Sequence, residues 1–250
     1  AHGHAVRVLR SLVPGARIGC APVLVAAAPA TPSAADVAAA ERWTWQMPHT
    51  RLRVSSWWMD PIYRGHYPED GLRALGRAAP RVSAGDFDLI AQPLDYLGCN
   101  LYDVVRVRAN AEGEPEEVPF PQGFPRTAFG WPVTPEGMYW GPRFAHARYG
   151  LPVLITENGM SNRDWVALDG AVHDPERVDF LRRHLAELAR AVADGVPVLG
   201  YFHWSLLDNF EWNHGYRERF GLVHVDYATG TRTPKDSARA YAAYIAAQRP

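Results

Sequence analysis

Four segments of the chain carry apolar residues in nearly continuous runs, with turn-forming or polar residues at both ends. Continuous hydrophobicity, in place of strict alternation, favours strands that are covered on both faces, as in parallel sheets. The four segments are 16–25 (ARIGCAPVLV), 94–107 (LDYLGCNLYDVVRV), 151–159 (LPVLITENG) and 196–210 (VPVLGYFHWSLLDNF). We therefore expect one buried strand in each of them.

Helical patterns lie between and around these strands. The segment 175–195 is strongly amphipathic, and Ser33 stands where a helix over 33–45 needs an N-terminal cap. Further elements are predicted as helices at 4–12 and 236–248 and a hairpin at 220–234. This alternation of strands and helices predicts a parallel sheet with helical crossovers, and hence an α/β fold.

The number of strands limits the architecture. A closed (β/α)8 barrel, the TIM barrel, needs roughly 250 residues, which is the length of this chain. Only about four strand–helix units are visible, because long loops rich in Trp, Pro and Gly follow the first two strands. The pattern therefore predicts half of a barrel, folded as a single domain over residues 1–250.

Composition narrows the classes of partner. The formal net charge is −1, so no global field recruits nucleic acid or an anionic membrane. The longest apolar run, 20–30 (CAPVLVAAAPA), is too short to span a bilayer and contains prolines. Cys20 and Cys99 lie inside apolar strand-like runs, which favours two buried thiols and a reducing, cytoplasmic location. No secretory signal is visible, although the chain begins with Ala and not Met.

Polar and aromatic side chains gather at the ends of the last three predicted strands. In parallel α/β barrels the reacting groups lie at the C-terminal ends of strands. These ends carry Asn100, Tyr102, Glu157, Asn158, Trp204, Asp208, Asn209, Glu211 and Trp212. Indole faces pack against the C–H face of a sugar ring, and acidic oxygens accept hydrogen bonds from its hydroxyls. The set is therefore typical of a polyol-binding site.

Several longer motifs follow one another along the chain. They are WMDPIYRGHYP (58–68), GWPVTPEGMYW (130–140), ITENG (155–159), GYFHWSLLDNFEW (200–212), and RFGLVHVDY (219–227) followed by KDSARAY (235–241). In their residues and in their order along the chain, these motifs resemble those of the family 1 glycoside hydrolases, the retaining β-glucosidase family. The resemblance covers nearly the whole chain. It implies the second half of a (β/α)8 barrel, strands 5–8, with the N-terminal half absent.

The resemblance also implies roles for particular residues. Glu157, in ITENG, would be the nucleophile that forms a covalent glycosyl-enzyme, and Tyr102 would hydrogen-bond to it. The substrate-binding residues would be Asn100, Trp131, Trp204, Glu211, Trp212 and Phe220. Taken alone, each of these side chains also fits a structural role at a strand end, at the barrel rim or in the core.

The implied substrate is a β-glucoside or a related small saccharide. Glu211 would repel a phosphate at the far end of the sugar, so an unphosphorylated sugar is expected. No metal or other cofactor is implied, because the reaction uses only carboxyl groups and water.

One part of the expected chemistry is missing from the sequence. Retaining glycosidases use two carboxyl groups about 5–5.5 Å apart, and in this family the second comes from a T-x-N-E-P motif. The chain contains no Asn-Glu-Pro tripeptide, and its opening AHGHAVRVLRSL resembles the helix that follows that motif. Three explanations stay open: a fragment of a longer enzyme, which we favour, one chain of a split enzyme, or a truncated product with little activity.

A half barrel leaves two sheet edges and an apolar layer uncovered. The expected partner is therefore a complementary N-terminal half-barrel or a second copy of the chain. The alternative to an enzyme is a non-catalytic carbohydrate-binding or assembly half-barrel that needs a partner chain.

Overall fold

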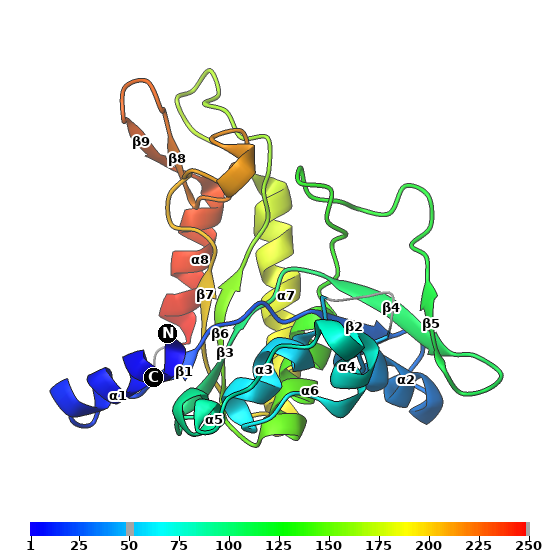
Figure 1. The fold of residues 1–250 in the computed structure, drawn as a ribbon. Helices are drawn as coiled ribbons and strands as arrows, with labels where there is room; N and C mark the ends of the chain where they lie inside the picture. Colours follow the sequence, from blue (N-terminus) through cyan, green and yellow to red (C-terminus); the bar gives the residue numbers. More distant parts are fainter. Residues whose placement is uncertain (49–52, 249–250) are drawn as a thin grey trace.

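The centre of the computed structural model, which describes residues 1–48 and 53–248, is a four-stranded parallel sheet (Figure 1). Its strands lie in the order β1 (Gly19–Cys20), β3 (Tyr96–Asn100), β6 (Val153–Asn158) and β7 (Val198–His203). Every neighbouring pair is parallel, so the chain has to return along the sheet between strands. The strands follow their sequence order, as they do in a barrel wound in one direction.

Three helices cover the outer face of this sheet. They are α6 (Gly137–Tyr149), α7 (Pro175–Ala193) and α8 (Asp236–Ala247). Figure 1 shows α7 and α8 running alongside β6 and β7. The buried residues at the interface of the strands with α6 and α7 include Leu97, Cys99, Val153, Ile155, Met138, Phe144, Leu188 and Ala191. The strands were expected to be covered on both faces, and these helices cover one of the two faces.

Four predicted helices are confirmed, with small shifts at their ends: α1 (His2–Leu12), α2 (Ala34–Trp45), α7 and α8. Ser33 caps α2 as predicted, since its side chain accepts a hydrogen bond from the Asp36 amide. The hairpin is confirmed as the antiparallel pair β8 (Val223–Val225) and β9 (Arg232–Pro234).

The sequence pattern missed several elements in stretches expected to be loops. Besides α6, they are α3 (Ser55–Tyr63), α4 (Glu69–Leu75), α5 (Asp86–Ile90) and the 3-10 turns η1 (Gly76–Ala78) and η2 (Trp212–His214). Aromatic packing supports the short helices: the ring of Trp57 stacks on that of Tyr67, with ring centroids 4.4 Å apart. The long connection between the first two strands of the sheet is thus largely folded.

The prediction of one strand over 94–107 is wrong. Strand β3 ends at Asn100, and β4 (Val104–Ala109) belongs to a second sheet, in the order β2 (Ala26–Pro29), β4 and β5 (Pro115–Val118). The break falls where the Leu101 amide donates to the Glu157 carbonyl oxygen at 2.9 Å and the chain then leaves the first sheet. A continuous apolar run does not show this change of sheet.

Two other predicted strands are shorter than expected. The segment 16–25 forms only β1, with an isolated bridge from Val23 to Asn100, before the chain enters β2. The segment 196–210 is a strand only as far as His203. The remaining residues of 196–210 are irregular because they build the cavity described below.

Both edges of the four-stranded sheet are open. Within the described chain, β1 and β7 each have one neighbour in the sheet. Phe202 on β7 is 60% exposed, and Val8 and Leu12, which share one side of α1, are 53% and 74% exposed. Apolar side chains of this size are more often exposed where another segment or chain covers them. The sheet is therefore half of a barrel, as predicted. No helix among the described residues has the length and hydropathy that a membrane span requires.

Candidate active site

An irregularity in strand β6 places Glu157 in a cavity. Val153 and Ile155 are fully buried in the helix-covered core, and strict alternation would turn Glu157 to the same side. However, Cys99 pairs with Ile155 while Asn100 pairs with Glu157, so β6 holds one extra residue at this point. A bulge of this kind redirects the side chains that follow it. Glu157 consequently lines a cavity at the C-terminal end of the sheet.

The neighbours of Glu157 in the chain fix its backbone. The Thr156 hydroxyl donates a hydrogen bond to Oδ1 of Asn100 at 2.6 Å. Asn158 is fully buried, and its Oδ1 accepts a hydrogen bond from the Tyr201 hydroxyl at 2.8 Å. Because both flanking side chains are bonded to adjacent strands, Glu157 has little freedom to leave the cavity wall.

Tyr102 holds the Glu157 carboxylate directly. Its hydroxyl donates to Oε2 of Glu157 at 2.6 Å. Burial, together with this hydrogen bond to Glu157, raises the pKa of the Tyr102 phenol, so the phenol keeps its proton. The ring lies against Trp131 and Phe220, with centroids 5.0 and 6.4 Å away. The hydrogen bond predicted from the motif resemblance is present in the structure.

The cavity has a volume of about 470 Å³. Seven of the eight residues predicted for the site line it, namely Tyr102, Trp131, Glu157, Trp204, Glu211, Trp212 and Phe220. Asn100 does not line the cavity, since its amide oxygen is bonded to Thr156 beside Glu157. Glu157 of β6 and residues of the segments that follow β3 and β7 therefore meet at one place.

The segment after β7 carries a second carboxylate and two indoles that line the same cavity as Glu157. Trp204 follows the strand directly, and the carbonyl oxygen of Trp204 would lie 1.9 Å from any Cβ at Gly159. Only glycine allows this approach of the two strand ends. Burial raises the pKa of Glu211, and the nearby Glu157 charge adds to this effect. Trp212 is 79% exposed, whereas Phe220 is buried.

Nine further residues that the sequence did not predict line the cavity, and the aromatic or charged ones among them are Trp43, Arg53 and Asp103. Burial raises the pKa of Asp103, and the charges of Arg53 and Arg126 oppose this shift. Asp103 directly follows the predicted site residue Tyr102, so its place beside the cavity could have been predicted from the sequence. Trp43 and Arg53 had no such signal, because the long connection between β1 and β3 brings them to the site.

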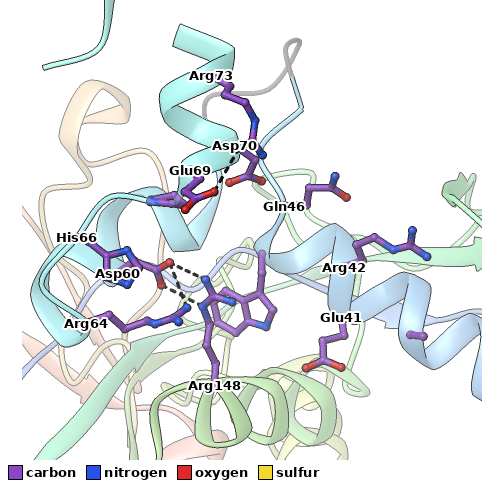
Figure 2. Close-up of a pocket in the computed structure, with 13 residues that line it drawn as sticks. Glu41, Arg42, Gln46, Asp60, Arg64, His66, Glu69, Asp70, Arg73 and Arg148 are labelled. Carbon is purple, nitrogen blue, oxygen red and sulfur yellow. Dashed lines mark hydrogen bonds and ion pairs between the residues drawn. The ribbon is translucent and has the colours of Figure 1, made fainter. Parts of the chain in front are cut away.

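A larger hollow, of about 650 Å³, lies between α2 and the α3–α4 segment. Figure 2 shows the residues that line it. None of the predicted site residues lines it. The fully buried Asp60 carboxylate accepts hydrogen bonds from Nε and Nη2 of Arg148, at 3.0 and 2.5 Å, and from the Tyr149 hydroxyl at 2.8 Å. These bonds tie α3 to α6, so the charged groups at the base of this cleft have a structural role.

No group of three or more His, Cys, Asp or Glu side chains is placed to hold a metal ion in residues 1–48 or 53–248.

His184 on α7 is buried, and His203 on β7 is half-buried with its Nε2 atom shielded from solvent. Burial lowers the pKa of His203 to about 3, and the charges of Arg177 and Lys235 add to this shift. Burial also lowers the pKa of His184 to about 4. An unfolded histidine titrates near pH 6.5. Between the folded-state pKa values and pH 6.5, the two histidines are protonated in the unfolded chain but not in the folded chain. Acid therefore favours unfolding.

We expect the free energy of unfolding to fall by about 2 kcal/mol for each of these histidines between pH 6.5 and pH 4.5. Urea unfolding of the wild type, His184→Gln and His203→Gln at the two pH values measures this. Each variant should lose less stability on acidification than the wild type does. If both variants lose as much free energy of unfolding between the two pH values as the wild type does, the lowered histidine pKa values are wrong.

The fold and the cavity together define a class of protein. The parallel strands with helices outside them are half of a (β/α)8 scaffold, and the cavity at their C-terminal ends brings together two carboxylates, a tyrosine and several indoles. The sequence model of glycosyl hydrolase family 1 matches residues 1–250. The chain belongs to this family.

Its relatives include bacterial proteins named as β-glucosidases or glucan glucohydrolases. The chain is 40% identical over 239 residues to β-glucosidase A of Thermotoga maritima, a match that covers 95% of this chain and 52% of the relative. It is 40% identical over 247 residues to the 1,4-β-D-glucan glucohydrolase of Thermotoga neapolitana, covering 98% and 54%. The structure of the Thermotoga maritima β-glucosidase in complex with glucoimidazole matches with a TM-score of 0.81 at 37% identity, over 98% of this chain and 54% of that one.

The chain thus spans about half the length of the relatives it matches. The matched structures support the assignment of the four strands to half of a TIM barrel.

Proposed function

We propose that the chain contributes the nucleophile and much of the sugar-binding wall of a retaining β-glucosidase. The hydrogen bond of 2.6 Å from Tyr102 to Glu157, inside a cavity lined by Trp204, Glu211 and Trp212, is the observation that carries the proposal. A carboxylate oxygen of Glu157 forms a bond to the anomeric carbon as the bond from that carbon to the aglycone oxygen breaks. Water then hydrolyses the glycosyl-enzyme and restores the carboxylate.

The substrate class follows from the cavity walls. Glu211 accepts hydrogen bonds from sugar hydroxyls in this proposal, and the indole of Trp204 packs on the ring. The negative charge of Glu211 disfavours a phosphorylated sugar. Relatives named as β-glucosidases, and a matched β-glucosidase structure in complex with glucoimidazole, support a β-glucoside as substrate.

The second carboxyl group is proposed to come from a complementary N-terminal half-barrel, joined to this chain or separate. The open edges at β1 and β7 and the exposed Phe202 are the surfaces it would cover. Self-association of the chain is the other arrangement that would cover them. The relatives are about twice as long as the matched region, which supports the first arrangement.

The proposal is tested by the stereochemistry of the product. An aryl β-glucoside is incubated with the chain and its complementary half, and proton NMR follows the anomeric signals. A double displacement at Glu157 releases β-glucose first, before mutarotation. Release of α-glucose first, or no hydrolysis of any β-glycoside by the assembled halves, would count against it.

Tyr102→Phe is expected to slow formation of the glycosyl-enzyme by about 10- to 100-fold. The variant keeps the ring packing against Trp131 but loses the bond that orients Glu157. Stopped-flow release of the aglycone from an activated substrate measures this step. Tyr244→Phe, on an exposed tyrosine of α8 that does not line the cavity, is the matched control. Equal rates in Tyr102→Phe and the wild type would show that the hydrogen bond has no part in positioning the nucleophile.

The cytoplasmic location stays a prediction. Cys20 and Cys99 are free thiols in the structure, which agrees with a reducing compartment.

A further inference from the structure

The segment 209–220 carries three of the cavity residues but has little regular structure. Glu211, Trp212 and Phe220 all lie in it, and within it the described backbone forms only the turn η2. A segment of this length held by few contacts would be mobile. Its anchorage therefore matters for the proposed binding of the sugar.

The buried carboxylate of Asp208 anchors both ends of this segment. Its Oδ1 accepts a hydrogen bond from the Gly221 amide at 2.9 Å, and its Oδ2 accepts from Nη1 of Arg219 at 2.6 Å and from the Val225 amide at 3.3 Å. Asp208 precedes the segment, whereas Gly221 directly follows it. One carboxylate thus joins the two ends of the loop.

Gly221 allows the two ends to meet. A Cβ at this position would lie 2.1 Å from the Asp208 amide nitrogen and 2.4 Å from the Leu207 carbonyl carbon. The backbones on the two sides of the loop are therefore in direct contact, and no other residue fits there without moving them.

Lys235 extends this anchor to the segment that follows Glu157. It is the only lysine in the sequence and is fully buried. Its Nζ donates to Oδ1 of Asp208 at 2.8 Å and to Oδ2 of Asp164 at 2.6 Å. Asp164 follows strand β6 and lies seven residues after Glu157. One ammonium group therefore bridges the loop after β6 and the loop after β7.

Arg177 of α7 completes the cluster. It forms ion pairs with Asp164, at 2.7 Å, and with Asp174, and its Nη2 donates to the carbonyl oxygen of Arg219 at 3.0 Å. The buried acids Asp164, Asp174 and Asp208 thus face the bases Arg177, Arg219 and Lys235, so the charges balance. Removal of one member leaves an uncompensated buried charge.

We propose that Lys235 and Asp208 are positioning residues that set the place of Glu211 and Trp212 relative to Glu157. None of the ion-cluster residues lines the cavity, so they act through the loop. Asp208 lies three residues before Glu211, and a displacement of about 1 Å at a reacting centre costs about 100-fold in rate. The inference rests on the proposed function for the roles of Glu157 and Glu211.

Deuterium exchange tests the anchorage without any need for activity. In Lys235→Met, peptides covering 209–220 should exchange at least about tenfold faster than in the wild type, while peptides covering α6 keep their rate. Lys235→Arg should restore protection. Arg239→Met is the matched control, because Arg239 lies on α8 and its ion pair with Asp236 is exposed. Unchanged exchange of 209–220, or an equal rise in 209–220 and α6, would overturn the proposal.

Labelling of Glu157 tests the link to the reaction. With a 2,4-dinitrophenyl 2-deoxy-2-fluoro-β-glucoside, Lys235→Met should form the adduct about 10- to 100-fold more slowly than the wild type, and Arg239→Met should match the wild type. Equal labelling rates in Lys235→Met and the wild type overturn the proposal. A wild type that does not label contradicts the proposed function, and the exchange data alone then decide the anchorage.

Asp208→Asn serves if Lys235→Met does not fold. This variant keeps the shape of the side chain and its acceptor oxygen but removes the charge that pairs with Lys235 and Arg219. The same two readouts apply, with the same expected directions.

Discussion

Replacing Glu157 with glutamine is expected to lower the hydrolysis of an aryl β-glucoside by about 10⁴–10⁶-fold, the scale seen when a nucleophile is removed. The amide has nearly the shape of the carboxylate and can still accept the hydrogen bond from Tyr102. It has no charge to stabilise an oxocarbenium-like transition state, and it does not form the glycosyl ester. The assembled halves are assayed by absorbance of the released phenolate.

Glu69→Gln is the control for this experiment, because Glu69 lies on α4 with its side chain 87% exposed. It should retain the wild-type rate. Circular dichroism of both variants shows that neither has unfolded. A Glu157→Gln variant with more than a tenth of the wild-type rate would remove Glu157 from the proposed reaction.

The second large effect concerns the complementary half. Addition of a chain that supplies the first four strand–helix units of a β-glucosidase barrel is expected to raise the hydrolysis of cellobiose by about 10²–10⁴-fold. Departure of a sugar alkoxide needs a proton, and the proposal places the acid on that half. Cellobiose hydrolysis is followed by enzymatic detection of glucose.

A substrate with an activated leaving group separates the two contributions of the added half. Dinitrophenolate leaves without a proton, so its release should gain far less than the hydrolysis of cellobiose does. Equal gains for both substrates would mean that the added half only completes the fold. Full cellobiose activity of the isolated chain would mean that a carboxyl group of this chain acts as the acid.

Much of the fold was predictable from local patterns. The amphipathic period of α7 and the capping residue of α2 are encoded within a few residues, and both helices formed where predicted. The split of 94–107 into β3 and β4 was not predictable, because a continuous apolar run fits one buried strand as well as two strands of different sheets. The helices between β1 and β3 depend on aromatic packing over long sequence distances.

The candidate site was predictable in its residues but not in its geometry. The motif resemblance selected Glu157 and Tyr102, and the structure brings them to 2.6 Å. Residue alternation would have turned Glu157 into the core, and the bulge that prevents this depends on pairing with β3. The bonds from Lys235 to Asp164 and Asp208 span 71 and 27 residues, so no local pattern indicates them.

The most direct test of the account is tandem mass spectrometry of the chain after reaction with the activated 2-deoxy-2-fluoro-β-glucoside. The account predicts one fluoroglucosyl group per chain, carried by the Glu157 side chain within the peptide that contains ITENG. Attachment to another residue, or an unmodified Glu157 in a chain that releases the phenolate, would contradict it.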